Sequence, residues 1–132
     1  MATRQWLIST NGTYDFNNPV DWQFGVIPSL SDVALFNTGA VDTITGNASI
    51  AELLITNSQL AITGSYTISG AQATELSLVA GGFSAFLTIL PGAAIIGNQA
   101  VSVTGSGAVL SIQGEFVAGS LTVSGVRGRR RR

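Results

Sequence analysis

The chain of 132 residues contains no histidine, no cysteine and no lysine. Without these side chains it cannot form a Ser-His-Asp triad, a Cys-His pair, a lysine Schiff base, a phosphate-binding Walker loop or a histidine zinc site. Disulfides and thiolate metal sites are excluded because cysteine is absent. We therefore expect a protein that is not an enzyme and that uses no metal and no cofactor.

Charge and long apolar runs are scarce as well. Charged residues make up 10% of the chain and hydrophobic residues 45%, which is typical of one folded domain rather than a disordered segment. The longest apolar runs, such as residues 93–96, fall far short of the roughly 18 residues of a transmembrane helix. The first residues lack the apolar core of about 7 to 15 residues that marks a secretory signal, so we expect no signal peptide in this chain.

What the sequence does contain is a rhythm of short apolar triplets between residues 48 and 125. Most triplets place apolar side chains at positions i and i+2 around a small residue, which is the period of a strand with one buried face. Gly, Ser, Thr and Asn separate them, mostly at spacings of six to eleven residues, too short for intervening helices. The triplets are Leu53-Leu54-Ile55, Leu60-Ala61-Ile62, Tyr66-Thr67-Ile68, Leu76-Ser77-Leu78, Leu87-Thr88-Ile89, Val101-Ser102-Val103, Leu110-Ser111-Ile112 and Leu121-Thr122-Val123.

This rhythm predicts an all-β fold, and specifically a β-solenoid of about three to four coils at the usual repeat length of roughly 20 to 25 residues. A compact antiparallel sandwich or barrel is the alternative, because it also combines many short strands with Gly-rich turns. We divide the chain into a cap at residues 1–36, a solenoid at residues 37–125 and a basic tail at residues 126–132. The side chains expected to face the core are Leu53, Ile55, Leu60, Ile62, Leu76, Leu78, Leu87, Ile89, Val101, Val103, Leu110, Ile112, Leu121 and Val123.

Residues 1–36 differ in amino-acid composition from the rest of the chain. Six of the ten aromatic residues lie in this segment: Trp6, Tyr14, Phe16, Trp22, Phe24 and Phe36. A solenoid exposes its core at each open end, so bulky side chains are needed to cover one of them. We predict that these aromatics form an amino-terminal cap, with a carbohydrate-stacking platform of exposed Trp and Tyr as the alternative.

The same segment carries a motif: Trp6, Asp21-Trp22, Gly25, Pro28, Asp32, Ala34 and Phe36, followed by Ile44-Thr45 and Ala51-Glu52-Leu53-Leu54-Ile55. It resembles the opening module of autotransporter passenger domains and related bacterial surface proteins. The resemblance implies a short right-handed parallel β-helix located outside the cell or on its surface. It also implies an adhesive or structural function, with a carbohydrate or a host surface as candidate partner.

Carboxylates are the only acid–base groups left for catalysis. A glycosidase needs two of them about 5 to 10 Å apart, and Asp15 and Asp21 are the nearest pair in an aromatic setting. We keep a polysaccharide-cleaving β-helix as an alternative on this basis. Asp32 is expected to accept backbone N–H bonds in a turn rather than to act on a substrate.

The charges are divided unevenly along the chain. All seven acids lie before residue 116, where Arg4 is the only base, and the tail supplies Arg127, Arg129, Arg130, Arg131 and Arg132. These arginines are our candidate contact for an anionic partner or for the acidic body of a neighbouring copy, and nucleic acid is expected only through them. This division favours a second hypothesis: a self-assembling homo-oligomer, such as a phage fibre, spike or decoration subunit of a virion, or a filament subunit.

Overall fold

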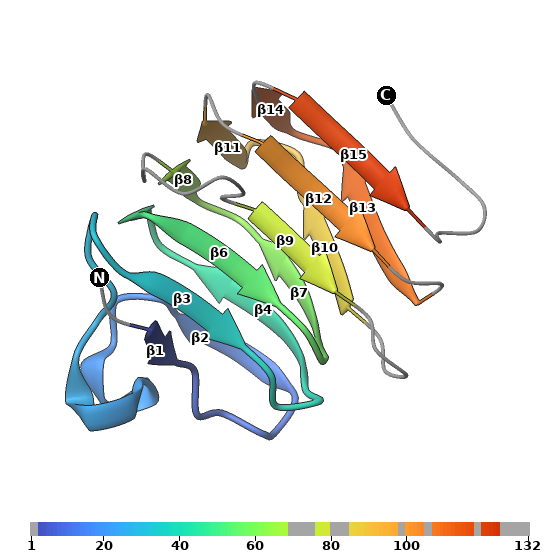
Figure 1. Cartoon of the computed structure of the whole chain (residues 1–132). Coiled ribbons are helices and arrows are strands. Elements are labelled where there is room, and N and C mark those ends of the chain that lie inside the picture. Colours follow the sequence, from blue (N-terminus) through green and yellow to red (C-terminus); the bar gives the residue numbers. More distant parts are fainter. Residues whose placement is uncertain are drawn as a thin grey trace.

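The computed structural model describes residues 3–68, 76–79, 85–97, 100–104, 107–117 and 120–124, and these ranges consist mostly of strands (Figure 1). The prediction of an all-β fold is confirmed. The alternative of an antiparallel sandwich or barrel is wrong, because every ladder between the described strands is parallel. A single isolated bridge within the described residues, between Trp6 and Trp22, is antiparallel.

The strands form three sheets. The six-stranded sheet has the order β1 (Thr3–Gln5), β3 (Val33–Phe36), β6 (Glu52–Ile55), β9 (Leu76–Val79), β12 (Ala100–Thr104), β15 (Ser120–Ser124). The five-stranded sheet has the order β13 (Ala108–Ile112), β10 (Ala85–Ile89), β7 (Ser58–Ile62), β4 (Val41–Thr45), β2 (Gly12–Asp15). The four-stranded sheet has the order β14 (Glu115–Val117), β11 (Ala94–Gly97), β8 (Ser65–Ile68), β5 (Ala48–Ile50).

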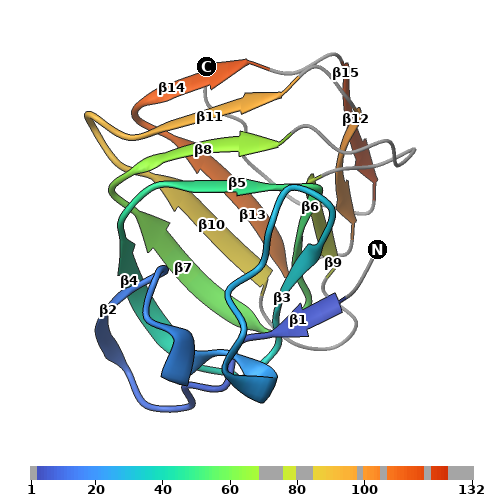
Figure 2. The same ribbon diagram turned by 90° about the vertical axis from the view of Figure 1, so that its left-hand side faces the viewer.

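From β3 onward the chain visits the six-stranded, the five-stranded and the four-stranded sheet in turn and then returns to the first (Figures 1 and 2). We call one such passage a circuit. Each strand pairs with its counterpart in the next circuit, as Val33 does with Glu52, 19 residues later, and Leu76 with Val101, 25 residues later. Neighbours in a sheet are therefore one circuit apart in sequence, and the loops absorb the differences in length.

Apolar side chains at alternate strand positions stack in columns inside the three sheets. In one column Ile44, Ile62 and Ile89 are paired in register, and all three are fully buried. The predicted inward orientation is confirmed for ten residues: Leu53, Ile55, Leu60, Ile62, Leu76, Leu78, Leu87, Ile89, Val101 and Val103. Leu110 and Ile112 are only partly buried and pack against this core. The side chains of Leu121 and Val123 lie outside the described residues.

Four of the six aromatic residues predicted for the cap, Trp6, Phe16, Trp22 and Phe36, form one buried cluster, whereas Tyr14 is partly buried against the core and Phe24 is exposed. Trp22 lies at its centre, with ring centroids 5.0 Å from Trp6, 4.9 Å from Phe16 and 5.4 Å from Phe36. Tyr66 from β8 joins the cluster through Phe16, at 5.4 Å. The Trp22 indole donates a hydrogen bond of 2.7 Å to the Phe16 carbonyl. The cluster thus covers the amino-terminal end of the column; the Trp22 indole N–H is hydrogen-bonded, whereas the buried Trp6 Nε1 and Tyr66 hydroxyl have no hydrogen-bond partner among the described residues.

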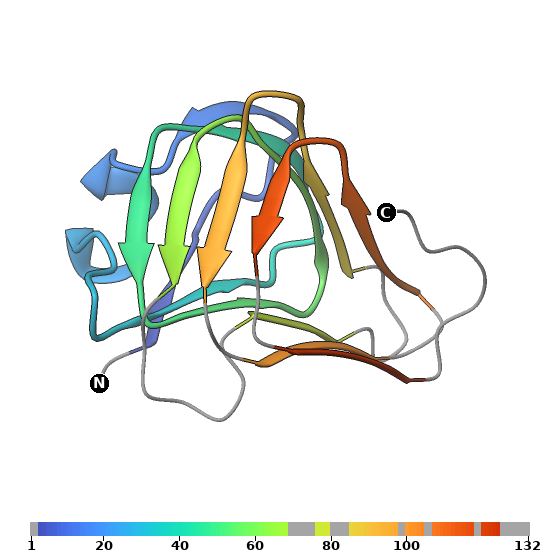
Figure 3. The same ribbon diagram turned by 90° about the horizontal axis from the view of Figure 1, so that it is seen from above.

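Two 3₁₀ turns, η1 (Pro19–Asp21) and η2 (Gln23–Gly25), connect β2 to β3 over this cluster. Asn18 begins η1: its side chain accepts from the Val20 amide at 3.4 Å, and Pro19 supplies a fixed φ at the first position. Seen from above, the blue segment that contains both turns lies at one end of the stack and the orange and red strands at the other (Figure 3). No helix in the described residues has the length and apolar character that crossing a membrane requires.

The corner between the five-stranded and four-stranded sheets is held by side-chain amides. Asn47 accepts the Ser65 amide through its Oδ1 at 2.9 Å, and its backbone carbonyl accepts from Asn17 Nδ2 at 2.9 Å. At this corner Gly64 passes so close to the Gly46 carbonyl that a Cβ would overlap it. Polar side chains and a missing side chain therefore fix how successive circuits stack.

Candidate interaction surface on the amino-terminal cap

Exposed apolar side chains are concentrated on the cap. Among the described residues, five of the nine large apolar side chains that are exposed fall in the short stretch from residue 7 to residue 30: Leu7, Val20, Phe24, Val26 and Leu30. Phe24 is 79% exposed and Val20 74%, the two highest values in this group. The outer side of the cap therefore offers apolar surface that contributes nothing to the buried cluster beneath it.

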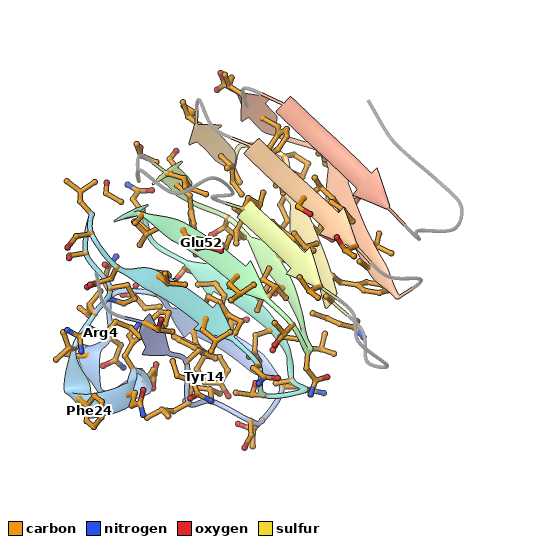
Figure 4. The ribbon with its side chains drawn as sticks, in the orientation of Figure 1. Arg4, Tyr14, Phe24 and Glu52 are labelled. Carbon is orange, nitrogen blue, oxygen red and sulfur yellow. The ribbon has the colours of Figure 1, made fainter. Side chains whose placement is uncertain are left out.

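Phe24 has an unusual backbone conformation. Its φ of 63° and ψ of 11° lie in the left-handed region, which disfavours a residue with a Cβ and is uncommon for an aromatic one. The following Gly25 is also left-handed, with φ of 67°, and its amide donates to the Trp22 carbonyl at 2.9 Å. The ring lies at the outer edge of the cap (Figure 4). The chain thus holds an aromatic ring in water at a conformational cost.

Two carboxyl groups, those of Asp15 and Asp21, belong to the same cap segment. Asp21, the last residue of η1, is buried, and its backbone carbonyl accepts from the Leu7 amide at 2.9 Å. Burial raises the pKa of the Asp21 carboxyl, and the negative charge of Asp15 raises it further. Asp15 at the end of β2 is exposed and accepts the Asn17 amide at 2.9 Å. Within the described residues no base forms an ion pair with either carboxylate; the pair of Arg4 and Asp32 lies elsewhere.

Asp42 is a buried carboxyl inside the core. In β4 it occupies the column of Leu60 and Leu87, opposite Gly12 of β2, whose amide donates to it at 3.1 Å. Burial raises the pKa of Asp42, and the Gly12 amide and the Trp6 indole oppose this rise. The Trp6 Nε1 nevertheless reaches no acceptor in hydrogen-bonding geometry among the described residues. Asp42 therefore places a polar group at the end of an otherwise apolar column.

Asp32 has the structural role expected for it. Its Oδ2 accepts the Ser29 amide at 3.0 Å and the Ser29 hydroxyl at 3.1 Å, closing the turn before β3. Arg4 Nε lies 3.7 Å from the same oxygen, at a site where both side chains are largely shielded from solvent. These contacts tie β1 to the turn that begins the first circuit.

The sequence predictions for the site have mixed outcomes. Arg127, Arg129, Arg130, Arg131 and Arg132 lie outside the described residues. A stacking platform of exposed Trp and Tyr is wrong for Trp6 and Trp22, which are buried, and Tyr14 is partly buried against the core. The structure does bring Asp15 and Asp21 within electrostatic range of each other. The exposed Phe24 was missed, since its sequence context gives no sign that its backbone is left-handed.

We compared the chain with family models, curated proteins and solved structures. None of them matches it. Its function is therefore inferred from its own residues and geometry.

The burial of the Asp21 carboxyl, together with the negative charge of Asp15, leads to a prediction about pH. Because the folded-state pKa is raised above the unfolded value of about 3.9, the charged carboxylate destabilises the fold at pH 7, and this effect disappears once both states are protonated. We expect Asp21→Asn to raise the melting temperature at pH 7 by a few degrees, and the effect to fade as the pH falls through the raised folded-state pKa and to vanish below about pH 3, where both states are protonated.

The measurement is thermal unfolding of both proteins, followed by circular dichroism between pH 3 and pH 8. Glu115→Gln is the control: this exposed acid lies at the start of β14, far from the cap, and its substitution is expected to change the free energy of unfolding by about 0.5 kcal/mol or less. A lower melting temperature for Asp21→Asn than for the wild type at pH 7 would contradict the inference that the charged Asp21 carboxylate destabilises the fold.

Proposed function

We propose that the chain is a short right-handed parallel β-helix that serves as a non-enzymatic structural or adhesive module outside the cell or on its surface. The observation that carries the proposal is the fixed order in which the chain visits three parallel sheets around one continuous apolar core. Each circuit is then one coil. Right-handedness agrees with the strong preference of crossovers between parallel strands.

The location of the motif residues supports the likeness to autotransporter passengers. Trp6, Trp22 and Phe36 pack together in the cap cluster, with Trp6 and Phe36 centroids 5.3 Å apart. Gly25 adopts the left-handed conformation that favours glycine, and Asp32 closes the turn into β3. The motif thus corresponds to a physical unit that starts the first circuit. An extracellular, adhesive function is the use that such a module has in the proteins it resembles.

A second candidate function, a self-assembling structural subunit of a virion or filament, is favoured by the charge division. All seven acids precede residue 116 and five of six arginines follow residue 126, so one copy is electrostatically complementary to the next. The sedimentation of the purified chain separates the two functions: a module that is only adhesive stays monomeric, whereas a subunit associates as its concentration rises.

The proposal predicts that the purified protein does not cleave polysaccharides. The burial of Asp21 argues against this residue as a general acid for a polymeric substrate, although Asp15 nearby is exposed. We expect no new reducing ends and no unsaturated products from a panel of plant, microbial and animal polysaccharides. Binding to the same polysaccharides or to host cells, without cleavage, would support an adhesin.

The matched variant for this experiment is Asp15→Asn, which keeps an oxygen to accept the Asn17 amide while removing the charge. The wild type and the variant are expected to be equally inactive. Cleavage by the wild type that disappears in a folded Asp15→Asn protein would replace the structural proposal with a glycosidase.

A further inference from the structure

We infer that the outer surface of the cap, formed by Leu7, Val20, Phe24 and the exposed carboxylate of Asp15, binds the arginine segment at residues 127–132 of a second copy of this chain. The inference rests on the proposed self-assembly and names the surfaces that produce it. Three properties carry it: an aromatic ring displayed in water, an acidic pair that forms no ion pair within the described residues, and the opposite charge of the partner segment.

The first property is the presentation of Phe24. The backbone of Phe24 is left-handed, and the residue is 79% exposed, so it buries little surface in the fold. Val20 in η1, four residues before Phe24, is also exposed, and the Leu7 amide donates a hydrogen bond to the Asp21 carbonyl at the end of η1. An aromatic face in such a setting attracts a guanidinium by cation–π interaction and by planar stacking.

The second property is the uncompensated charge of Asp15 and Asp21. Asp15 offers an exposed carboxylate, and the buried Asp21 behind it adds negative potential. A planar guanidinium matches a carboxylate through two parallel N–H···O bonds, which a lysine ammonium cannot reproduce. Arginine side chains would therefore gain both a carboxylate and an apolar face on this surface.

The third property is the charge of the partner segment. Residues 127–132 contain five of the six bases of the chain, and all five are arginine. The body that carries the cap holds all seven acids. Charge complementarity thus selects this segment over any other part of the chain as the occupant of the cap.

Chain length indicates that the segment comes from another copy. In the six-stranded sheet, β15 and β1 are separated by five strand-to-strand steps, about 24 Å at 4.8 Å per step. Three residues lead from Ser124 to Arg127 and span at most about 10 Å, and even Arg130 extends only about 20 Å. Arg127 therefore cannot contact the cap of its own copy even with its side chain extended, and a contact that uses all five arginines has to come from another copy. A contact from one end of a copy to the other end of the next is heterologous and can continue into a filament.

The first experiment measures binding of a labelled peptide with the sequence of residues 126–132 to a full chain whose five tail arginines are replaced by glutamine. We expect saturable binding that weakens with salt. Phe24→Gly and Asp15→Asn are each expected to weaken it about tenfold or more, which corresponds to about 1.4 kcal/mol. A peptide with lysine in place of arginine should bind more weakly at the same charge.

Two variants provide matched controls. Ile96→Ala removes an exposed apolar side chain from β11, and Glu115→Gln removes an exposed acid from β14, both away from the cap. Both are expected to leave peptide binding unchanged. Equal weakening by Asp15→Asn and Glu115→Gln would show general attraction between a polycation and an acidic protein, and would overturn the inference. Phe24→Gly is expected to fold, because glycine accepts the left-handed conformation without strain.

The second experiment is complementation in the ultracentrifuge. Phe24→Gly has an intact tail and a damaged cap, and the chain with the five Arg→Gln changes has the reverse. Each is expected to be monomeric alone, and the two together to form a heterodimer that does not grow. Self-association of the chain with the five Arg→Gln changes, when it is alone in solution, would overturn the inferred contact. The proposed self-assembly would then have to use another surface. If the wild type is monomeric and the peptide does not bind, both the head-to-tail contact and the proposed self-assembly are overturned. These outcomes are independent of the test for polysaccharide cleavage.

Discussion

Replacing Ile89 by Asp is expected to unfold the protein. Ile89 in β10 is fully buried and lies in register between Ile62 and Ile112. A carboxylate at this position would have the apolar Ile62 and Ile112 on either side, and Arg4, the one base among the described residues, lies in β1 of another sheet. The transfer of an unpaired charge into such a site costs several kcal/mol, against a total stability of roughly 5 to 15 kcal/mol for a domain. Circular dichroism and proteolysis of the purified variant measure the outcome.

Thr88→Asp is the matched control for this substitution. Thr88 is the neighbouring residue of the same strand, but its side chain points to the outer face, between Ala61 and Ser111. The same new charge is solvated there, and we expect a loss of about 1 kcal/mol or less. A folded Ile89→Asp protein, or equal damage from both changes, would show that the inward assignment of this strand is wrong.

The contrast between these two residues explains why the core could be predicted from sequence. An alternation of period two assigns each strand residue to one of two faces, and a slip by one residue would expose the whole apolar set. Leu60, Ile62, Leu87 and Ile89 therefore have only one arrangement that buries them. The parallel ladders follow from repetition, because a short apolar face is covered by stacking on the next one.

The position of Asp42 could not be predicted from the alternation of apolar residues. Aspartate is typical of turns, and the alternation of apolar residues gives no reason to place Asp42 in a core column. In the structure it lies inside β4, in the column of Leu60, because Gly12 opposite it has no side chain and offers its amide instead. That partner is 30 residues away in sequence. A pattern of local periodicity contains no information about such a contact.

The candidate interaction surface was harder to predict than the core. The aromatic content of residues 1–36 indicates a cap, and four of the six aromatics in this segment do form one buried cluster, which Tyr66 of β8 joins. Phe24 belongs to the same composition but is turned outward by two consecutive left-handed residues. Hydrophobicity predicts burial only when the backbone directs the side chain inward. Whether a particular aromatic residue covers the core or contacts a partner therefore depends on a dihedral angle.

Trp22→Ala is expected to destabilise the protein by about 3 to 5 kcal/mol, the usual effect of truncating a buried large aromatic residue. The Trp22 ring contacts Trp6, Phe16 and Phe36 through edge-to-face arrangements, and its indole donates to the Phe16 carbonyl at 2.7 Å. Alanine would leave a cavity beneath η1 and an unpaired buried carbonyl. Because the cluster covers the end of the apolar column, solvent would also reach the first circuit. Urea unfolding followed by tryptophan fluorescence and circular dichroism measures the loss.

Two further variants distinguish the causes of this destabilisation. One tests the lost hydrogen bond separately from the cavity, and the other tests whether removing any aromatic ring from the segment has the same effect. Trp22→Phe keeps an aromatic ring but has no N–H donor. Its free energy of unfolding should therefore lie between those of the wild type and of Trp22→Ala. The difference from the wild type should be about 1 to 3 kcal/mol, the cost of an unsatisfied buried group. Phe24→Ala removes an exposed ring from the same segment and should change stability by about 0.5 kcal/mol or less. If Phe24→Ala were as damaging as Trp22→Ala, Phe24 would belong to the core of the cap, and its assignment to a partner-binding surface would fail together with the head-to-tail contact inferred from it.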